Sequence, residues 1–207
     1  MENEIKDTYL TISSATEEQL FKDKGSKFFS YAYPVSSKEQ AEEIVQNVHS
    51  AHHSARHCCY AWRVGQLSFS YRANDDGEPS GSAGAPIYNQ ILSAGVTNVL
   101  VVVVRYFGGV LLGVPGLVNA YKTAAQLALS SAETVEMTVE KPFSVHFTYP
   151  QMNTVMRIMK DSGARITGQD FKTECVLYFS VRLSLENKIR EAFAAQLYSA
   201  VLKDELL

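Results

Sequence analysis

The sequence is poor in the residues that mark several classes of protein. Cysteine occurs only three times in 207 residues, and two of the three are neighbours, so the chain lacks the disulfide framework of small secreted domains. No apolar run approaches the roughly 20 residues that a membrane-spanning helix needs. The acidic residues 1–4 are not followed by the apolar stretch of a secretory signal. We therefore expect a cytoplasmic protein that makes no contact with a membrane.

A large excess of one charge is also absent. Nineteen Lys and Arg residues face 22 Asp and Glu, and 46% of the chain is hydrophobic. This balance excludes a strongly basic chain that coats nucleic acid by charge alone, and also an acidic disordered chain. Residues 1–140 hold ten basic and fifteen acidic residues, whereas residues 141–207 hold nine and seven. Because Pro142 interrupts two extended-looking segments there, we expect one domain over residues 1–140 and a second over 141–207.

The first part of the chain alternates strand and helix patterns. Ser37 and Gln40 fit a capping box ahead of an amphipathic helix, and Ser82 is placed to cap a second helix. The β-branched run at 98–105 is apolar on both faces, which is typical of a central strand covered on both sides. The expected strands span residues 28–35, 57–64, 67–72, 98–105 and 134–139, and the expected helices span 38–48, 82–94 and 117–129.

The second part predicts the order β-α-β-β-α-β of a ferredoxin-like unit. The strand patterns lie at 143–149, 165–171, 174–183 and 201–206, and the helix patterns at 150–162 and 187–199. The expected class of the whole chain is therefore α+β, with an N-terminal α/β domain followed by a ferredoxin-like domain.

An acidic loop before the second helix is the first candidate site. It carries Asp75, Asp76 and Glu78, together with the hydroxyls of Ser80 and Ser82. The carboxylates could hold a divalent cation, or the N–H groups of residues 80–84 could cradle an anion at the helix start. The third interpretation is an ordinary turn. The alternate acidic spacing of a calcium loop is missing, so we assign no metal site and no cofactor.

A glycine-rich loop after the buried strand is the second candidate site. Arg105, Tyr106, Gly108 and Gly109 stand between a strand and a helix, where α/β folds often bind ligands. The loop is not a P-loop, because residues 114–115 are Val-Pro where Lys and Ser/Thr are needed. If the two loops face each other, they could form a small-molecule or phosphate site, enzymatic in one version, with Arg105 pairing an anion. Otherwise the glycines only permit close packing.

Histidine and cysteine residues are concentrated at positions 49–59 of the first domain. His53 and His57 would be i, i+4 neighbours on a helix, and Cys58 and Cys59 follow directly. We expect the helix to end before His57 and the two cysteines to alternate across a strand. Neither a zinc site nor a catalytic thiol is therefore favoured.

Several motifs together resemble a known family. SARHCCYAWRVG at 54–65, DDGEPSGSAG at 75–84 and VVRYFGG at 103–109 follow in order, and residues 113–121 then lead into a helix. With KGSKF at 24–28, the chain resembles the IMPACT family in its bacterial two-domain, YigZ-like form. The resemblance implies a first domain like the second domain of small-subunit ribosomal protein five. It also implies a ferredoxin-like second domain, similar to the C-terminal domain of elongation factor G.

The resemblance also implies a role in translation. Eukaryotic members regulate translation through a protein partner, ribosome or nucleic-acid association is suggested for bacterial members, and no catalytic constellation comes with the family. This chain has Leu111 or Leu112 and Asn119 where relatives tend to carry basic residues, which weakens the case for RNA binding by the first domain.

Our expectation is a translation-linked regulatory or binding protein rather than an enzyme. Its partner would be the ribosome, RNA or a translation-related protein. The small-molecule site is the alternative, and an acidic first domain that docks a basic protein is a third hypothesis. In the second domain, the residues expected to touch RNA or ribosome are Arg157, Lys160, Arg165 and Lys172.

Overall fold

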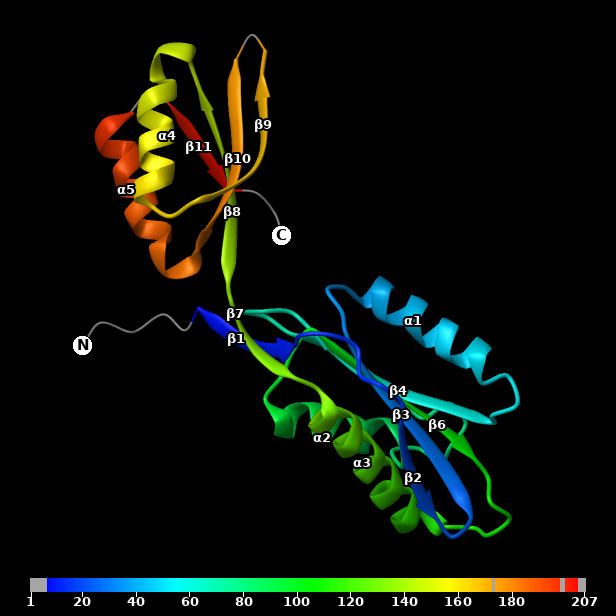
Figure 1. The fold of residues 1–207 in the computed structure, drawn as a ribbon. Coiled ribbons are helices and arrows are strands. Elements are labelled where there is room, and N and C mark those ends of the chain that lie inside the picture. Colours follow the sequence, from blue (N-terminus) through cyan, green and yellow to red (C-terminus); the bar gives the residue numbers. More distant parts are fainter. Residues whose placement is uncertain (1–6, 173, 198–199, 205–207) are drawn as a thin grey trace, which may run out of the picture. The chain divides into compact units, whose positions relative to one another are not determined.

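The chain forms two compact units. A computed structural model describes residues 7–172, 174–197 and 200–204 (Figure 1). One unit is made of residues 9–137, and the other of residues 138–204 together with residues 7 and 8. Over the described residues, the first unit holds nine basic and eleven acidic side chains, and the second holds nine and eight. Because Asp7 and Glu140 belong to the second unit, the charge contrast is smaller than a division at residue 140 implies.

The first unit is built on an antiparallel five-stranded sheet with the order β2-β3-β6-β4-β5. Four of its strands fall where the sequence predicts strands, whereas β2, an edge strand of mixed polarity, has no clear pattern. A separate two-stranded sheet joins β1 to β7. The strands are β1 (Thr8–Ile12), β2 (Gln19–Asp23), β3 (Ser26–Pro34), β4 (His57–Val64), β5 (Ser70–Asn74), β6 (Val99–Tyr106) and β7 (Thr134–Thr138).

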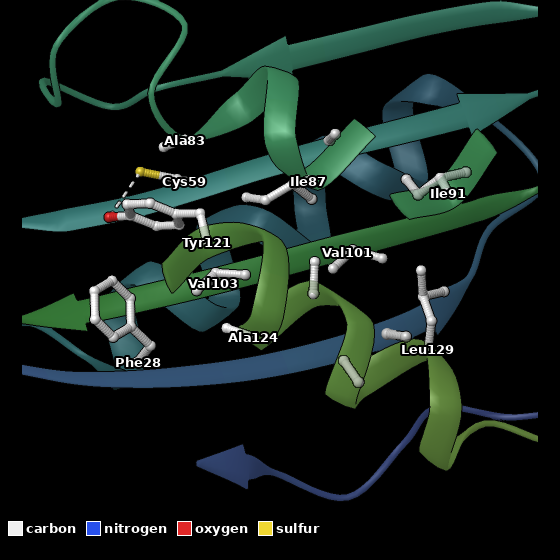
Figure 2. Packing of buried hydrophobic residues seen from close by; sticks show 14 of the residues in the cluster. Phe28, Cys59, Ala83, Ile87, Ile91, Val101, Val103, Tyr121, Ala124 and Leu129 are labelled. Carbon is white, nitrogen blue, oxygen red and sulfur yellow. Dashed lines mark hydrogen bonds between the residues drawn. The ribbon is translucent and has the colours of Figure 1, made fainter. Parts of the chain in front are cut away.

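Strand β6 is central and covered on both faces, as its sequence predicts. Val99, Val101 and Val103 point to the face covered by α2 (Gly84–Ala94) and α3 (Gly113–Ser131). Figure 2 shows Val101 and Val103 among side chains of these two helices. The alternate residues Leu100, Val102 and Val104 pack on the other face, which α1 (Lys38–Ala51) covers in part. All six are fully buried, and burying each contributes about 1.5–3 kcal/mol.

Helix starts depart from the sequence expectations in three places. The Gln40 N–H donates to Ser37 Oγ at 3.2 Å as expected, but the Gln40 side chain accepts from the N–H of Ser36 instead of Ser37. Ser82 does not cap α2, because its hydroxyl donates to the Pro79 carbonyl at 2.6 Å. Helix α3 begins at Gly113, earlier than predicted, because Pro115 is tolerated in a first turn whose N–H groups need no helical partner.

The second unit has the predicted element order, with a four-stranded sheet ordered β11-β8-β10-β9. A 3₁₀ turn containing Pro150 precedes the first helix, and another precedes the second. Phe143, Leu177 and Phe179 lie in its core. The elements are β8 (Glu140–Phe147), α4 (Met152–Asp161), β9 (Arg165–Phe171), β10 (Cys175–Arg182), α5 (Glu186–Gln196) and β11 (Val201–Asp204).

Asp7 is held to the second unit by an ion pair. Its carboxylate accepts hydrogen bonds from Arg182 Nε and Nη2 at 2.6 and 2.8 Å. These bonds, with a further one from Ser184, hold the pKa of Asp7 well below its ordinary value. Separately, none of the described helices combines the length and apolar character needed to cross a membrane.

Candidate functional site

The acidic loop and the glycine-rich loop converge in space. They line a common cavity of about 480 Å³, to which the first contributes Glu78 and Pro79 and the second contributes Arg105, Phe107 and Leu111. The residues just before and at the start of β4, including His57, complete its wall. The two sequence motifs therefore meet, as the hypothesis of a shared site requires.

Glu78 and Arg105, which line this cavity, bond to each other, and Glu78 also bonds to Tyr121 behind them in the core. Glu78 Oε1 accepts hydrogen bonds from Arg105 Nη1 at 2.7 Å and from the Tyr121 hydroxyl at 2.8 Å. The Glu78 and Arg105 side chains are only 4% and 7% exposed. Burial raises the pKa of Tyr121, so its hydroxyl stays protonated and donates. Arg105 is therefore committed to Glu78, and this arrangement supports a structural role over anion binding.

The Asp75 carboxylate accepts the backbone N–H groups that the sequence suggested as donors to an external anion. One carboxylate oxygen accepts from the N–H groups of Ala83 and Gly84 at 3.0 and 2.8 Å, and the other accepts from Gly81 at 2.8 Å. Burial opposes ionisation of Asp75, but the three donors outweigh it and lower its pKa below the ordinary value. The start of α2 is thus capped by this carboxylate, which does what Ser82 was expected to do.

The remaining contacts fix the acidic loop to β4. The Asp76 carboxylate accepts the Cys58 N–H at 2.6 Å, and His57 Nδ1 lies 2.8 Å from the Asp76 carbonyl oxygen. The Cys59 thiol donates to the Asp75 carbonyl at 3.0 Å. Each carboxylate of this loop therefore has an internal partner, while Ser80 is exposed. Within the described part of the chain, no group of three or more His, Cys, Asp or Glu side chains is placed to hold a metal ion.

The glycine of the second motif is required by a close backbone contact. The Gly108 N–H donates to Ser26 Oγ at 3.2 Å. A Cβ atom at position 108 would lie only 1.8 Å from the carbonyl carbon of Gly25. The segment 24–28 and the motif at 103–109 thus pack directly against each other, whereas Gly109 is exposed at a φ of +89°.

Both neighbouring cysteines are buried, on opposite faces of the sheet. Cys58 faces the α1 side, and Cys59 faces α2 and α3, which confirms that they alternate across a strand. Figure 2 shows Cys59 bonded to the Tyr121 hydroxyl, at 3.4 Å. Burial raises the pKa of Cys58 to about 12 and also raises the pKa of Cys59. Neither is a thiolate at neutral pH, so neither is prepared for nucleophilic chemistry.

The four basic residues predicted to contact RNA do not form one cluster. Arg157 and Lys160 lie one turn apart on α4, both exposed. Arg165 begins β9 and Lys172 directly follows its last residue, so the two are roughly 20 Å apart at the usual rise per residue. Arg165 pairs with Glu140 at 2.6 Å and Lys172 with Asp170 at 2.9 Å.

An aromatic cluster that the sequence did not predict lies beside the glycine-rich loop. His52, at the end of α1, places Nε2 2.8 Å from the Tyr31 hydroxyl and Nδ1 3.0 Å from the Tyr106 hydroxyl. Phe29 packs against both His52 and Tyr106. The signal was present as the alternation of Phe29, Tyr31 and Tyr33, which predicts only that these rings share one face of a strand.

Comparisons with known proteins give the family. The family model described as the Impact N-terminal domain matches residues 24–129. IMPACT family member YigZ of Escherichia coli (strain K12) is 34% identical over 160 residues, covering 74% of this chain and 76% of the relative. An IMPACT family member of Haemophilus influenzae is 34% identical over 198 residues, covering 91% and 90%. A solved structure titled as an hypothetical protein is similar along 97% of this chain and 98% of its own, with a TM-score of 0.73 and 26% identity. The chain belongs to the IMPACT family.

Proposed function

We propose that this protein is a translation-linked regulatory or binding protein that acts through the ribosome, RNA or a partner protein. A binding role, rather than catalysis, is supported by the contacts that the polar residues of the acidic loop and of the central strand make with one another. Glu78, Arg105 and Tyr121 bond to one another, and Asp75 caps the helix that follows its own loop. Residues committed to such contacts hold a fold and are poorly placed to react with a substrate. The link to translation comes from the family resemblance.

The arrangement of the second unit supports the proposed domain likeness. Its strand order β11-β8-β10-β9 and its two helices suit a ferredoxin-like domain similar to the C-terminal domain of elongation factor G. For the first unit we propose a likeness to the second domain of small-subunit ribosomal protein five. A cytoplasmic location fits both likenesses. We propose that the two units act as separate domains, divided near residue 140.

In the second unit, Arg157 and Lys160 are the best placed of the predicted contact residues. They lie on one helix, both are exposed, and neither forms an ion pair with a described residue. Arg165 and Lys172 could still exchange their carboxylate partners for phosphates, because exposed ion pairs contribute little stability.

Co-sedimentation with ribosomes tests this proposal. The intact protein should pellet with ribosomes at low salt and be released as salt rises, because phosphate contacts are salt-dependent. The variant Arg157→Ala/Lys160→Ala should pellet several-fold less. The control Lys122→Ala/Lys188→Ala, which removes the same charge from exposed helical positions, should behave as the parent chain. A protein that stays wholly in the supernatant at low salt would contradict the proposal.

A small-molecule or phosphate-binding role, enzymatic in one version, is the second candidate, and the shared cavity of about 480 Å³ favours it. Arg56 is exposed at the rim of this cavity and forms no ion pair with a described residue. Inorganic phosphate should then raise the thermal midpoint of the parent chain and raise that of Arg56→Ala less. Equal shifts in both chains would exclude phosphate at this rim.

A further inference from the structure

Three lysines stand without ion pairs on one hairpin of the first unit. Lys22 of β2 lies directly opposite Lys27 of β3, and Lys24 sits in the turn between them at a φ of +42°. All three are exposed, and no described carboxylate lies within ion-pair distance of them. Like charges directly opposite on neighbouring strands destabilise a sheet, and a non-glycine residue at positive φ is unusual. The hairpin therefore concentrates positive charge that nothing in the unit neutralises.

An aromatic cavity adjoins these lysines. It has a volume of about 310 Å³ and is lined by Gly25, Lys27, Phe29, His52, Tyr106 and Phe107. The register places Lys27 opposite Tyr106 in the sheet, so the cavity opens beside the lysine row. Figure 1 shows the β2–β3 turn and the chain after β6 at the same end of this sheet.

The walls of this cavity are held in place. Phe29 meets the Tyr106 ring edge-on, with ring centroids 5.6 Å apart. His52 is fixed between the hydroxyls of Tyr31 and Tyr106. Phe107, in contrast, is 47% exposed and forms the outer wall, which it shares with the cavity of about 480 Å³ next to it. A preformed aromatic floor with one exposed ring at its edge is suited to stacking a planar group, and this ring, Phe107, has its centroid 5.7 Å from the Arg105 guanidinium carbon.

We propose that this hairpin and cavity bind single-stranded nucleic acid, with one base stacked against Phe107 and phosphates paired with Lys22, Lys24 and Lys27. Aromatic rings beside a row of cations are the features by which proteins hold single strands, because rings stack bases and lysines neutralise phosphates. A duplex does not fit, because its bases are already stacked and paired. This inference names a ligand for the first unit and rests on the proposed function for its biological setting.

Neighbouring charges agree with this placement. Asp23 pairs in register with the buried Ser26, so it belongs to the opposite face of the hairpin from Lys22. Glu78 is buried and committed to Arg105. A second cavity, of about 350 Å³, continues past His52, but there Glu18 bonds to the Tyr31 hydroxyl. We therefore place the phosphates beside Lys22, Lys24 and Lys27 and not beside Glu18.

Binding to a labelled single-stranded oligomer of uniform sequence tests the inference, by fluorescence anisotropy on the full chain. The oligomer is used both as RNA and as DNA. The form that binds with the higher affinity identifies the type of nucleic acid that the site recognises. The variant Lys22→Gln/Lys24→Gln/Lys27→Gln should bind at least about tenfold more weakly, and the slope of log affinity against log salt should fall by about 2, since each single-strand contact contributes about 0.7. Phe107→Ala should weaken binding about 5- to 100-fold through lost stacking.

Matched variants separate this site from a net-charge effect. Lys38→Gln/Lys122→Gln/Lys188→Gln removes the same charge from exposed positions elsewhere, and Phe69→Ala removes a ring of similar exposure from the segment just before β5, the edge strand farthest from β2. Both should bind as the parent chain does. Equal loss in the control variants, or a duplex bound as tightly as the single strand, would overturn the inference.

The oligomer assay and the ribosome assay fail independently. A parent chain that does not bind the oligomer overturns this site, whatever it does with ribosomes. A parent chain that binds the oligomer but never pellets with ribosomes contradicts the proposed function and leaves the site standing.

Discussion

Glu78 and Arg105 form a buried ion pair, with Oε1 and Nη1 2.7 Å apart and both side chains less than a tenth exposed. Glu78 lies on the acidic loop and Arg105 near the end of the central strand, so the pair joins the two loops that line the cavity. The Nε atom of Arg105 is buried as well and has no hydrogen-bond partner among the described residues. Arg105 therefore depends on Glu78 for compensation of its charge.

Removing Glu78 should destabilise the first unit strongly. We expect Glu78→Gln to lower the free energy of unfolding by about 3–5 kcal/mol, because it leaves a buried guanidinium without its counter-charge. The fluorescence of Trp62, the only tryptophan and a buried residue of β4, reports urea unfolding of this unit.

The exposed pair Arg72–Glu42 provides the control for this measurement, with side chains 50% and 46% exposed. Glu42→Gln should cost less than about 1 kcal/mol. If Glu78→Gln costs no more than Glu42→Gln, the buried pair does not hold the loop in the way described.

Gly108→Ala should be destabilising for a purely steric reason. The added Cβ would meet the Gly25 backbone at 1.8 Å, and a backbone segment cannot rotate away as a side chain can. We expect a loss of about 3 kcal/mol or more in the free energy of unfolding, at or above the usual range for overpacking. Gly168→Ala is the control, because the atoms nearest to its Cβ would be those of the Tyr178 side chain, at an ordinary 3.5 Å or more. Similar losses for the two variants would argue against the contact.

Asp75→Asn should weaken the loop in a pH-dependent way. Loss of the charged cap should cost about 1–2 kcal/mol at neutral pH. Because folding lowers the pKa of Asp75, its contribution is complete above the ordinary value of 3.8 and is lost as pH falls through the lowered pKa. The difference in unfolding free energy between parent and variant should therefore narrow as the solution is acidified below that value. A difference that is constant with pH would contradict the role of the carboxylate charge.

Helices and strands could be predicted from the sequence where their own residues carry a clear hydrophobic pattern. The central strand could be found because Val99 through Val104 are apolar at every position, which a strand covered on both faces requires. The order of the second unit followed from alternating strand and helix periods in the same way. Strand β2 was missed because an edge strand of five residues carries little hydrophobic pattern.

The candidate site was harder to predict because its chemistry depends on partners. Ser82 and Asp75 are both good capping residues, and only the path of the loop decides that Asp75 reaches the helix. From its sequence position alone, Arg105 is predicted to bind an anion, whereas in the structure it pairs with Glu78. The aromatic cavity brings together Phe29, His52 and Phe107 from three segments that are far apart in the sequence. A local sequence pattern cannot predict such a contact.

The thiols should be unreactive in the folded protein. Cys58, Cys59 and Cys175 are all buried, which shields them from reagents. Burial also raises the pKa of Cys58 to about 12, so its nucleophilic thiolate is scarce at neutral pH. A thiol reagent such as DTNB should label the native chain slowly, and should label three groups at once after denaturation in urea. Cys58 and Cys59 should then react in proportion to the equilibrium population of the opened first unit, because reclosing is faster than a slow reagent, so Glu78→Gln should accelerate their labelling by the factor that its loss of stability gives. Rapid labelling of the native parent chain would instead mean that β4 exposes a thiol, and would reopen the case for a reactive cysteine beside His57.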